Sequence, residues 1–233
     1  MKERPILWSA PMVLALLAGR KTQTRRIVKH EHIDEADVFA FDTDRREWEM
    51  GEVHQGPTAH VGYVKPYAEV GDRLWGRETF STDARGVYPC PRAWYRADFT
   101  KHDDPKNAEH IRECDGGKKP WADCFACATD GDGVTWRPSI FMPRALSRLL
   151  HEVTAVRVER LQEITEEDAI AEGLVNRPSC VLPDVPMWGW PGSDRYYRHA
   201  REAYLAGWDT INGKGSAASN PWVWVVSFKP VAA

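Results

Sequence analysis

The sequence has no apolar run long enough to cross a membrane. A membrane-spanning helix needs roughly 20 consecutive apolar residues, and no stretch of this chain approaches that length. The apolar run from Met12 to Leu17 follows Pro11 and precedes Gly19 and a basic cluster. Its length and flanks do not fit a signal peptide. We therefore expect a chain without membrane contact, in the cytoplasm.

The chain also lacks a strong excess of either charge. It holds 31 Lys and Arg residues against 34 Asp and Glu residues, a formal net charge of -3 at pH 7. A protein that coats nucleic acid by bulk electrostatic attraction is strongly basic. That class is excluded, so any contact with nucleic acid must come from a local group of basic residues.

Cysteine is scarce, and its number is odd. The chain has 5 cysteines. An odd number in a chain without an export signal favours thiols or metal ligands over disulfides. Cys180 stands apart from the others in the sequence, and we expect it to be a free thiol.

The remaining cysteines lie in one loop-like segment, which has no hydrophobic core of its own and would be stabilised by a structural metal site. The Cys-x-x-Cys pair has zinc-knuckle spacing, and two more cysteines of the segment would complete a closed structural zinc site with no catalytic role. Reduced cysteines without metal are the alternative. The expected ligands are Cys90, Cys114, Cys124 and Cys127, with His102 or His110 as a substitute for Cys90.

Size and composition are those of an ordinary globular protein. Hydrophobic residues make up 42% and charged residues 28% of 233 residues, which excludes disordered and collagen-like chains. We expect one domain over residues 1–233. The chain has 11 tryptophans, and four of them either line a cleft or fill the core: Trp188, Trp190, Trp222 and Trp224.

Residues that typically begin and end helices predict two short helices. Residues 10–19 begin with Pro near the first turn and end at Gly19. Thr165 opens a second helix with a capping-box pattern, and Gly173 stops it. A third helix is expected over residues 195–207.

Alternating patterns predict the strands. The clearest is residues 151–161, where valines alternate with polar side chains. Residues 221–228 predict an apolar closing strand, and residues 70–80 a strand after a Gly-Asp turn. A strand signal also stands at residues 94–97, and the basic segment 20–26 suits a strand or an extended loop.

Three segments have little regular pattern and are predicted to be insertions in a smaller core. They cover about residues 29–67, with a hairpin around Trp48, then 81–136 and 177–219. Residues 213–219 within the last one are expected to be a flexible connection.

The order of several motifs resembles the ASCH family. These motifs are the Gly-Arg-Lys-Thr-Gln-Thr run at residues 19–24, Gly-Asp-Arg-Leu at 71–74, a valine-rich strand before residues 164–169, and a terminal Trp-Val strand. The chain is most similar to the larger form found in phages and prophages. The resemblance implies an α+β fold: a small β-barrel of the PUA-like type with flanking short helices and large loop insertions. PUA domains bind RNA.

The resemblance also implies an activity. Small bacterial ASCH proteins similar to this core are amidohydrolases that remove the acetyl group from N(4)-acetylcytidine with a Lys, a Thr and a Glu. Their pattern falls on Lys21, Thr24 and Glu172. For the Glu, three neighbours in sequence are alternatives: Glu163, Glu166 and Glu167.

Amide hydrolysis gives each of these residues a chemical role. Thr24 would be the nucleophile, and Lys21 its base if burial and nearby cations lower its pKa. Glu172 would hold the cytosine edge or relay the proton to the leaving nitrogen. Because residues three apart on an extended segment point to opposite faces, a turn or bulge must bring Lys21 and Thr24 together.

Other residues are predicted to contact the substrate, which would be a modified nucleoside or RNA or DNA containing it. A solvated basic surface is the alternative for the arginines near Lys21, and a cross-strand ion pair for Arg77 and Glu78. The predicted substrate-binding residues are Arg20, Arg25, Arg26, Trp75, Arg77 and Glu78.

A rival function uses the same basic cleft without catalysis. The chain would then bind RNA or a modified base, as PUA relatives do, and the Trp-rich loop 187–190 would supply stacking surfaces. No acidic metal cluster or catalytic His pair supports a nuclease.

Overall fold

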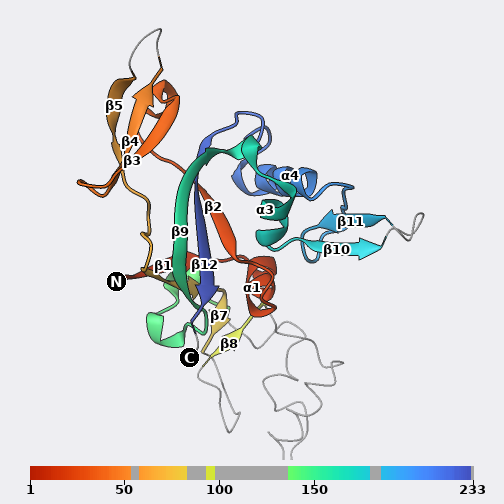
Figure 1. Ribbon diagram of the computed structural model, residues 1–233. Helices are drawn as coiled ribbons and strands as arrows, with labels where there is room; N and C mark the ends of the chain where they lie inside the picture. Colours follow the sequence, from red (N-terminus) through yellow and green to blue (C-terminus); the bar gives the residue numbers. More distant parts are fainter. Residues whose placement is uncertain (54–57, 83–92, 98–135, 179–184, 232–233) are drawn as a thin grey trace, which may run out of the picture. The chain divides into compact units, whose positions relative to one another are not determined.

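The fold is mixed α+β. It consists mostly of strands, which form several sheets, and has few helices in its described part. The computed structural model describes residues 1–53, 58–82, 93–97, 136–178 and 185–231 (Figure 1). No helix in these ranges is both long and apolar enough to span a bilayer. A single domain was expected over residues 1–233, and the structure divides into two compact units. The first is Met1–Arg4, Ala18–Leu74 and His151–Ala233, and the second is Pro5–Leu17 and Trp75–Leu150.

The main sheet has five strands in the order β1-β6-β9-β12-β2. In the first unit, β12 pairs antiparallel with both β9 and β2. Its apolar run Trp-Val-Trp-Val-Val is buried throughout, as expected for a strand covered on both faces. The strands predicted over 70–80, 151–161 and 221–228 are confirmed. The bounds are β1 (Glu3–Leu7), β6 (Arg73–Arg77), β9 (Leu150–Arg160), β12 (Trp222–Pro230) and β2 (Gln23–Ile27).

Side-chain alternation gives the β9-β12-β2 part of this sheet two distinct faces. Residues paired across the strands share a face, so the register defines both sets. We call one the helix face; it carries Ala155, Arg157, Glu159, Val223, Val225, Gln23, Arg25 and Ile27. We call the other the tryptophan face; it carries Val156, Val158, Trp222, Trp224, Val226, Thr24 and Arg26.

Two helices pack on the helix face (Figure 1). Helix α3 (Glu166–Ala171) follows η5 (Leu161–Glu163), and its first turn is capped by Thr165, whose hydroxyl accepts a hydrogen bond from the Asp168 amide at 3.1 Å. The predicted capping pattern and the stop at Gly173 are confirmed. Helix α4 is Ala200–Asn212. The core between them includes Leu161, Ile164, Ala169, Leu174, Ala203, Tyr204, Trp208, Val223 and Val225.

The tryptophan face is covered by a separate three-stranded antiparallel sheet. The Phe39 ring packs on Trp222 at 4.8 Å, and Trp48 packs on Trp224 at 5.8 Å between centroids. The 29–67 segment is therefore a folded sheet, larger than the expected hairpin, and Trp222 and Trp224 are core residues. The elements are η1 (Ile33–Glu35), β3 (Val38–Asp42), β4 (Glu47–Glu52) and β5 (Ala59–Val64).

The 177–219 segment is also more ordered in structure than its sequence indicates. Strands β10 (Val175–Pro178) and β11 (Pro186–Gly189) form a hairpin. Helix α4 begins five residues later than expected because Tyr197 pairs with Trp188 of β11 through two backbone hydrogen bonds of 2.7 and 2.8 Å. After α4, the Asp209 carboxylate accepts hydrogen bonds from two backbone amides of the expected flexible connection, so this connection forms defined turns.

The second unit contains the first predicted helix, α1 (Ala10–Leu17), which is confirmed. The described part of the 81–136 segment is short. Outside this segment, the Glu78 carboxylate is held by two hydrogen bonds of 2.9 Å from the Arg148 guanidinium. The remaining elements are β7 (Phe80–Ser81), β8 (Trp94–Tyr95), η3 (Ser139–Phe141) and η4 (Arg144–Leu146).

A buried histidine gives the first unit a pH-dependent stability. Burial lowers the pKa of His151 to about 4, and its Nδ1 has no hydrogen-bond partner in the described part of the chain. The unfolded chain, with a histidine pKa near ~6.5, binds the proton more readily. Stability is therefore lost as the pH falls from about 6.5 to about 4, by about 3 kcal/mol in total.

We expect His151→Phe to flatten this pH dependence, because the ring packs against Phe228 and phenylalanine can keep that contact without a titratable nitrogen. The measurement is the free energy of unfolding in urea at a series of pH values. His60→Phe is the matched control, since His60 is 48% exposed. Equal slopes for wild type and His151→Phe would contradict the assignment.

Candidate functional site

Lys21 is buried at the centre of the site and all three of its ammonium protons have acceptors. Nζ donates to the Glu172 carboxylate Oε2 at 2.6 Å, to the Glu172 carbonyl at 3.0 Å and to the Gln23 carbonyl at 2.9 Å. Burial lowers the pKa of Lys21, and the negative charge of Glu172 only partly opposes this effect. Lys21 is therefore easier to deprotonate than an ordinary lysine.

The chain reaches this position through two backbone anchors. The Thr22 amide donates to the Ala171 carbonyl at 2.8 Å, and the Thr22 carbonyl accepts from the Phe228 amide at 2.8 Å. These bonds fix the segment between the end of α3 and strand β12. Glu172 is the C-cap of α3, so the ammonium lies at the carbonyl end of that helix, where a cation is favoured.

Glu172 is the glutamate that contacts Lys21. This contact distinguishes it from the alternative glutamates nearby in the sequence. Its Oε1 accepts hydrogen bonds from Arg25 at 3.2 Å and from the Tyr204 hydroxyl at 3.4 Å. Glu163 instead accepts from the Arg160 amide, and Glu166 accepts from the Ala200 amide at the start of α4. Glu163 therefore binds a backbone amide at the start of η5, and Glu166 binds one at the start of α4.

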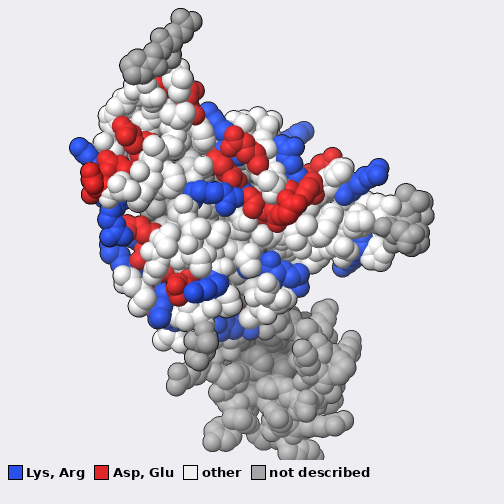
Figure 2. Space-filling model, viewed as in Figure 1, with Lys and Arg blue, Asp and Glu red and all other residues white. Residues whose placement is uncertain are grey.

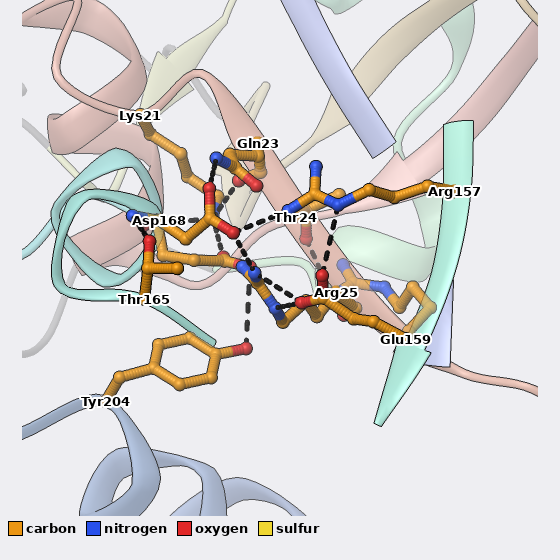
Figure 3. Close-up of polar contacts among 11 residues, drawn as sticks. Lys21, Gln23, Thr24, Arg25, Arg157, Glu159, Thr165, Asp168 and Tyr204 are labelled. Carbon is orange, nitrogen blue, oxygen red and sulfur yellow. Dashed lines mark hydrogen bonds and ion pairs between the residues drawn. The ribbon is translucent and has the colours of Figure 1, made fainter. Parts of the chain in front are cut away.

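Arg25 binds three carboxylates from two elements, and Figure 3 labels two of them, Glu159 and Asp168. Its side chain is 0% exposed. It donates to Glu159 of β9 at 2.6 and 2.9 Å, to Asp168 of α3 at 2.8 Å, and to Glu172. The Tyr204 hydroxyl points toward the same cluster from α4 (Figure 3). A planar guanidinium with several fixed donors suits this position, and a lysine could not replace it.

The cluster around Arg25 is close to electroneutral and partly exposed, since the Arg157 side chain is 41% exposed. Three cations face three carboxylates, because Arg157 also contacts Asp168 and Glu159. Burial raises the pKa of Asp168, but the hydrogen bond from Gln23 and the charges of Arg157 and Arg25 together bring it below its usual range. These contacts favour the ionised form of Asp168. The six members are Lys21, Arg25, Arg157, Glu159, Asp168 and Glu172.

Thr24 lies on the tryptophan face, opposite the side chains of Gln23 and Arg25. Its hydroxyl accepts a hydrogen bond from Arg26 at 3.1 Å. Strand β2 pairs with β12 without a register shift, so the expected bulge is not in the strand. Instead, Lys21 turns before the strand and its Nζ reaches the carbonyl of Gln23, which is bonded to the Thr24 nitrogen.

Sequence reasoning missed Tyr67, which lies near this site. Its hydroxyl is buried and has no hydrogen-bond partner among the residues that are described. Burial is the main reason that the pKa of Tyr67 rises to about 12, and the charges of Arg26 and Glu172 also act on it. A lone tyrosine in an irregular segment carries no signal that would have identified it.

The other predicted site residues lie elsewhere. Arg20 is exposed. Trp75, Arg77 and Glu78 belong to the second unit, where Arg77 lies over the Trp75 ring at 4.7 Å and Glu78 pairs with Arg148, not with Arg77.

The predicted zinc ligands cannot be placed. Cys90, Cys114, Cys124 and Cys127, with His102 and His110, lie outside the described residues, as does Cys180. Within the described ranges, no three His, Cys, Asp or Glu side chains are grouped as metal ligands. The zinc site remains a prediction.

Comparisons with family models, curated proteins and solved structures find no match for this chain. Function therefore has to be inferred from the residues and their geometry.

The Arg25 cluster predicts a large difference between two neighbouring arginines. Arg25→Met leaves three carboxylates without their shared cation, and loss of one partner from a buried ion pair typically costs about 3–5 kcal/mol. Arg20→Met, an exposed residue five positions earlier, should change the free energy of unfolding by less than about 0.5 kcal/mol. Chemical denaturation of both variants measures this. Similar losses for the two would refute the central role of Arg25.

Proposed function

We propose that the protein is an amidohydrolase that removes an acyl group from N(4)-acylated cytosine, with Lys21, Thr24 and Glu172 as its catalytic residues. The observation that carries this proposal is the buried lysine-carboxylate contact of 2.6 Å beside the Gln23-Thr24 peptide. The lowered pKa of Lys21 supports it, because a general base must be available near neutral pH. The resemblance to the ASCH family supplies the substrate class.

We also propose that the five-stranded sheet is the ASCH-type barrel of the PUA-like group. Its support is the order of elements around the site: the Lys-Thr-x-Thr segment leads into β2, the Gly-Asp turn precedes β6, and the valine-rich β9 leads into the short helix that ends at Glu172. The chain closes with β12, which lies between β9 and β2.

The first half of the reaction forms an ester on Thr24. Lys21 passes a proton to Glu172 across their short hydrogen bond. The resulting amine has to turn from the Gln23 carbonyl to the Thr24 hydroxyl, which lies on the tryptophan face, and takes its proton. The Thr24 oxygen attacks the acyl carbon, and the carbon–nitrogen bond breaks. Glu172 returns its proton to the leaving exocyclic nitrogen, so cytosine departs as a neutral amine.

The second half regenerates the enzyme. Lys21 again passes a proton to Glu172, and the resulting amine takes a proton from the water molecule that attacks the Thr24 ester. The bond from the acyl carbon to the Thr24 oxygen breaks, that oxygen takes a proton from Lys21, and the acyl group leaves as a carboxylic acid. Glu172 then returns its proton to Lys21. Glu172 acts as a relay in this scheme because its two oxygens are already engaged by Lys21, Arg25 and Tyr204.

Arg26 would stabilise the charge that develops on the reacting oxygens. Its NH1 donates to the Thr24 hydroxyl at 3.1 Å, and a preorganised cation at such a position lowers the barrier to oxyanion formation. Arg26 is half-buried, whereas Thr24 is only 1% exposed. Access of a substrate to Thr24 therefore requires the residues that cover it to move.

One observation favours a second candidate, a binding module without catalysis. Lys21, Thr24 and Glu172 are each at most 2% exposed, and a buried ion-pair network can serve the fold alone. The chain would then recognise RNA or a modified base through its surface. Binding of a cytidine-containing oligonucleotide without turnover of the acylated form would support this function.

Isosteric substitutions test the hydrolase. Thr24→Val removes the nucleophile and should lower kcat by at least ~1000-fold, whereas Thr24→Ser should retain measurable activity. Glu172→Gln should lower it by roughly 100- to 10,000-fold. The measurement is release of cytidine from N(4)-acetylcytidine, followed by absorbance and chromatography. Thr22→Val is the matched control, because Thr22 is exposed. Full activity of Thr24→Val would exclude this mechanism.

The reaction should also depend on pH through the Lys21-Glu172 pair. In this scheme the pair must hold one proton, because Glu172 delivers it to the leaving nitrogen, and burial lowers the pKa of Lys21. We therefore expect kcat/KM to fall with rising pH once Lys21 loses that proton, at a pH below the usual lysine range near ~10.4. A rate that is independent of pH from about 6 to about 10 would argue against a lysine base.

A further inference from the structure

A second site lies within the first unit, between the three-stranded sheet and β9. It is a pocket of about 520 Å³, within the range of roughly 300–1,000 Å³ that is typical of small-ligand sites. No step of the proposed hydrolysis uses it. The lining residues that matter here are Phe41, Arg46, Trp48, Pro66, Glu69 and Val156.

The chemistry of the pocket suits a flat heteroaromatic ring. Phe41 and Trp48 lie 5.5 Å apart between centroids, and Phe41 is still 50% exposed, so an aromatic surface remains open for stacking. Arg46 and Glu69 approach to 3.7 Å, and their side chains are 74% and 41% exposed. They offer hydrogen-bond donors and an acceptor side by side, as the carbonyl and amino edge of a nucleobase requires.

Arg46 holds this position at a conformational cost. Its φ of 57° lies in the left-handed region, which is uncommon for a residue other than glycine. It occupies the turn between β3 and β4, where the side chain is directed to the pocket. A left-handed residue is common at the end of a hairpin loop, and here it places Arg46 beside the pocket.

The pocket and Thr24 share one face of one sheet. Val156, which lines the pocket, pairs with Val226, and Val226 pairs with Thr24. Two strand spacings separate them, which corresponds to about 10 Å. Tyr67 follows Pro66 of the pocket. Its hydroxyl, which has no hydrogen-bond partner in the described part of the chain, lies within range of the charge of Arg26. Tyr67, next to the pocket residue Pro66, is thus close to Arg26, which donates a hydrogen bond to Thr24.

We propose that this pocket binds a base that flanks the reacting cytosine, so that the substrate is a short single-stranded nucleic acid and not a free nucleoside. The identity of the reacting residue rests on the proposed hydrolase function. Basic and acidic side chains are interspersed on the face shown in Figure 2, and the net charge is -3. Stacking therefore contributes more than phosphate attraction, and binding should depend only weakly on salt.

The test compares two substrates and two phenylalanines. Hydrolysis of N(4)-acetylcytidine is measured beside hydrolysis of the same residue at the centre of a trinucleotide, in ribose and deoxyribose forms. Phe41→Ala should lower kcat/KM for the trinucleotide by about tenfold or more and leave the nucleoside unchanged. Phe141→Ala is the matched control, since Phe141 is exposed and lies in the second unit; it should change neither. Loss on both substrates with Phe41→Ala, or on neither, overturns the proposal.

A binding measurement separates this proposal from the hydrolase itself. Binding of an unmodified single-stranded oligonucleotide is followed by tryptophan fluorescence for wild type, Phe41→Ala and Glu69→Gln. Weaker binding by both variants supports the pocket even if no acylated substrate is turned over. Equal binding by all three proteins overturns it even if hydrolysis is observed. The ribose and deoxyribose forms show which nucleic acid the site prefers.

Discussion

The Arg25 guanidinium is the interaction on which the first unit depends. It is fully buried and joins β2 to β9 through Glu159 and to α3 through Asp168 and Glu172. A buried cation is stable only when its partners remove the cost of desolvation, and a buried carboxylate has the same need. Arg25 and its carboxylates therefore require one another. The contact between helix and sheet is consequently tied to a single arrangement of charges.

The same charge balance sets the chemistry of the candidate site. Glu172 receives hydrogen bonds from Arg25 and Tyr204 on one oxygen and from Lys21 on the other. These contacts hold the carboxylate in one orientation, while burial makes the Lys21 ammonium less stable than it is in water. A short hydrogen bond between such partners is a natural path for a proton. The fold thus supplies the electrostatic environment, and Lys21 supplies the reactive group.

Sequence patterns predicted the elements with strong local signals and missed those that depend on distant partners. The capped helix at Thr165, the alternating β9 and the apolar β12 were predictable because each follows from its own residues. The three-stranded sheet was not, because its strands are held in part by Trp222 and Trp224, which lie 183 and 176 positions after their partners Phe39 and Trp48. Residues 195–199 were predicted to be helical for the same reason: the backbone pairing of Tyr197 with Trp188 of β11 depends on a distant partner.

The candidate site shows a similar division. The Lys-Thr-x-Thr pattern and a glutamate near the end of α3 were visible in sequence, and the contact between Lys21 and Glu172 agrees with that pairing. The role of Arg25 was not visible, because Arg157 and Glu159 read as the solvent-facing positions of a strand. The structure shows that Asp168 of α3 contacts Arg157, and that Glu159 is 13% exposed.

The two faces of β2 explain how one short strand can serve both stability and function. Gln23 and Arg25 point to the helix face, where they complete a buried network, whereas Thr24 and Arg26 point to the tryptophan face, in line with the aromatic pocket. Alternation separates these tasks by a single residue. A shift of one residue in the pairing with β12 would place Thr24 among the carboxylates and Arg25 among the tryptophans. Because that exchange would leave buried charges without partners, the ion-pair network also fixes the register that orients the proposed nucleophile.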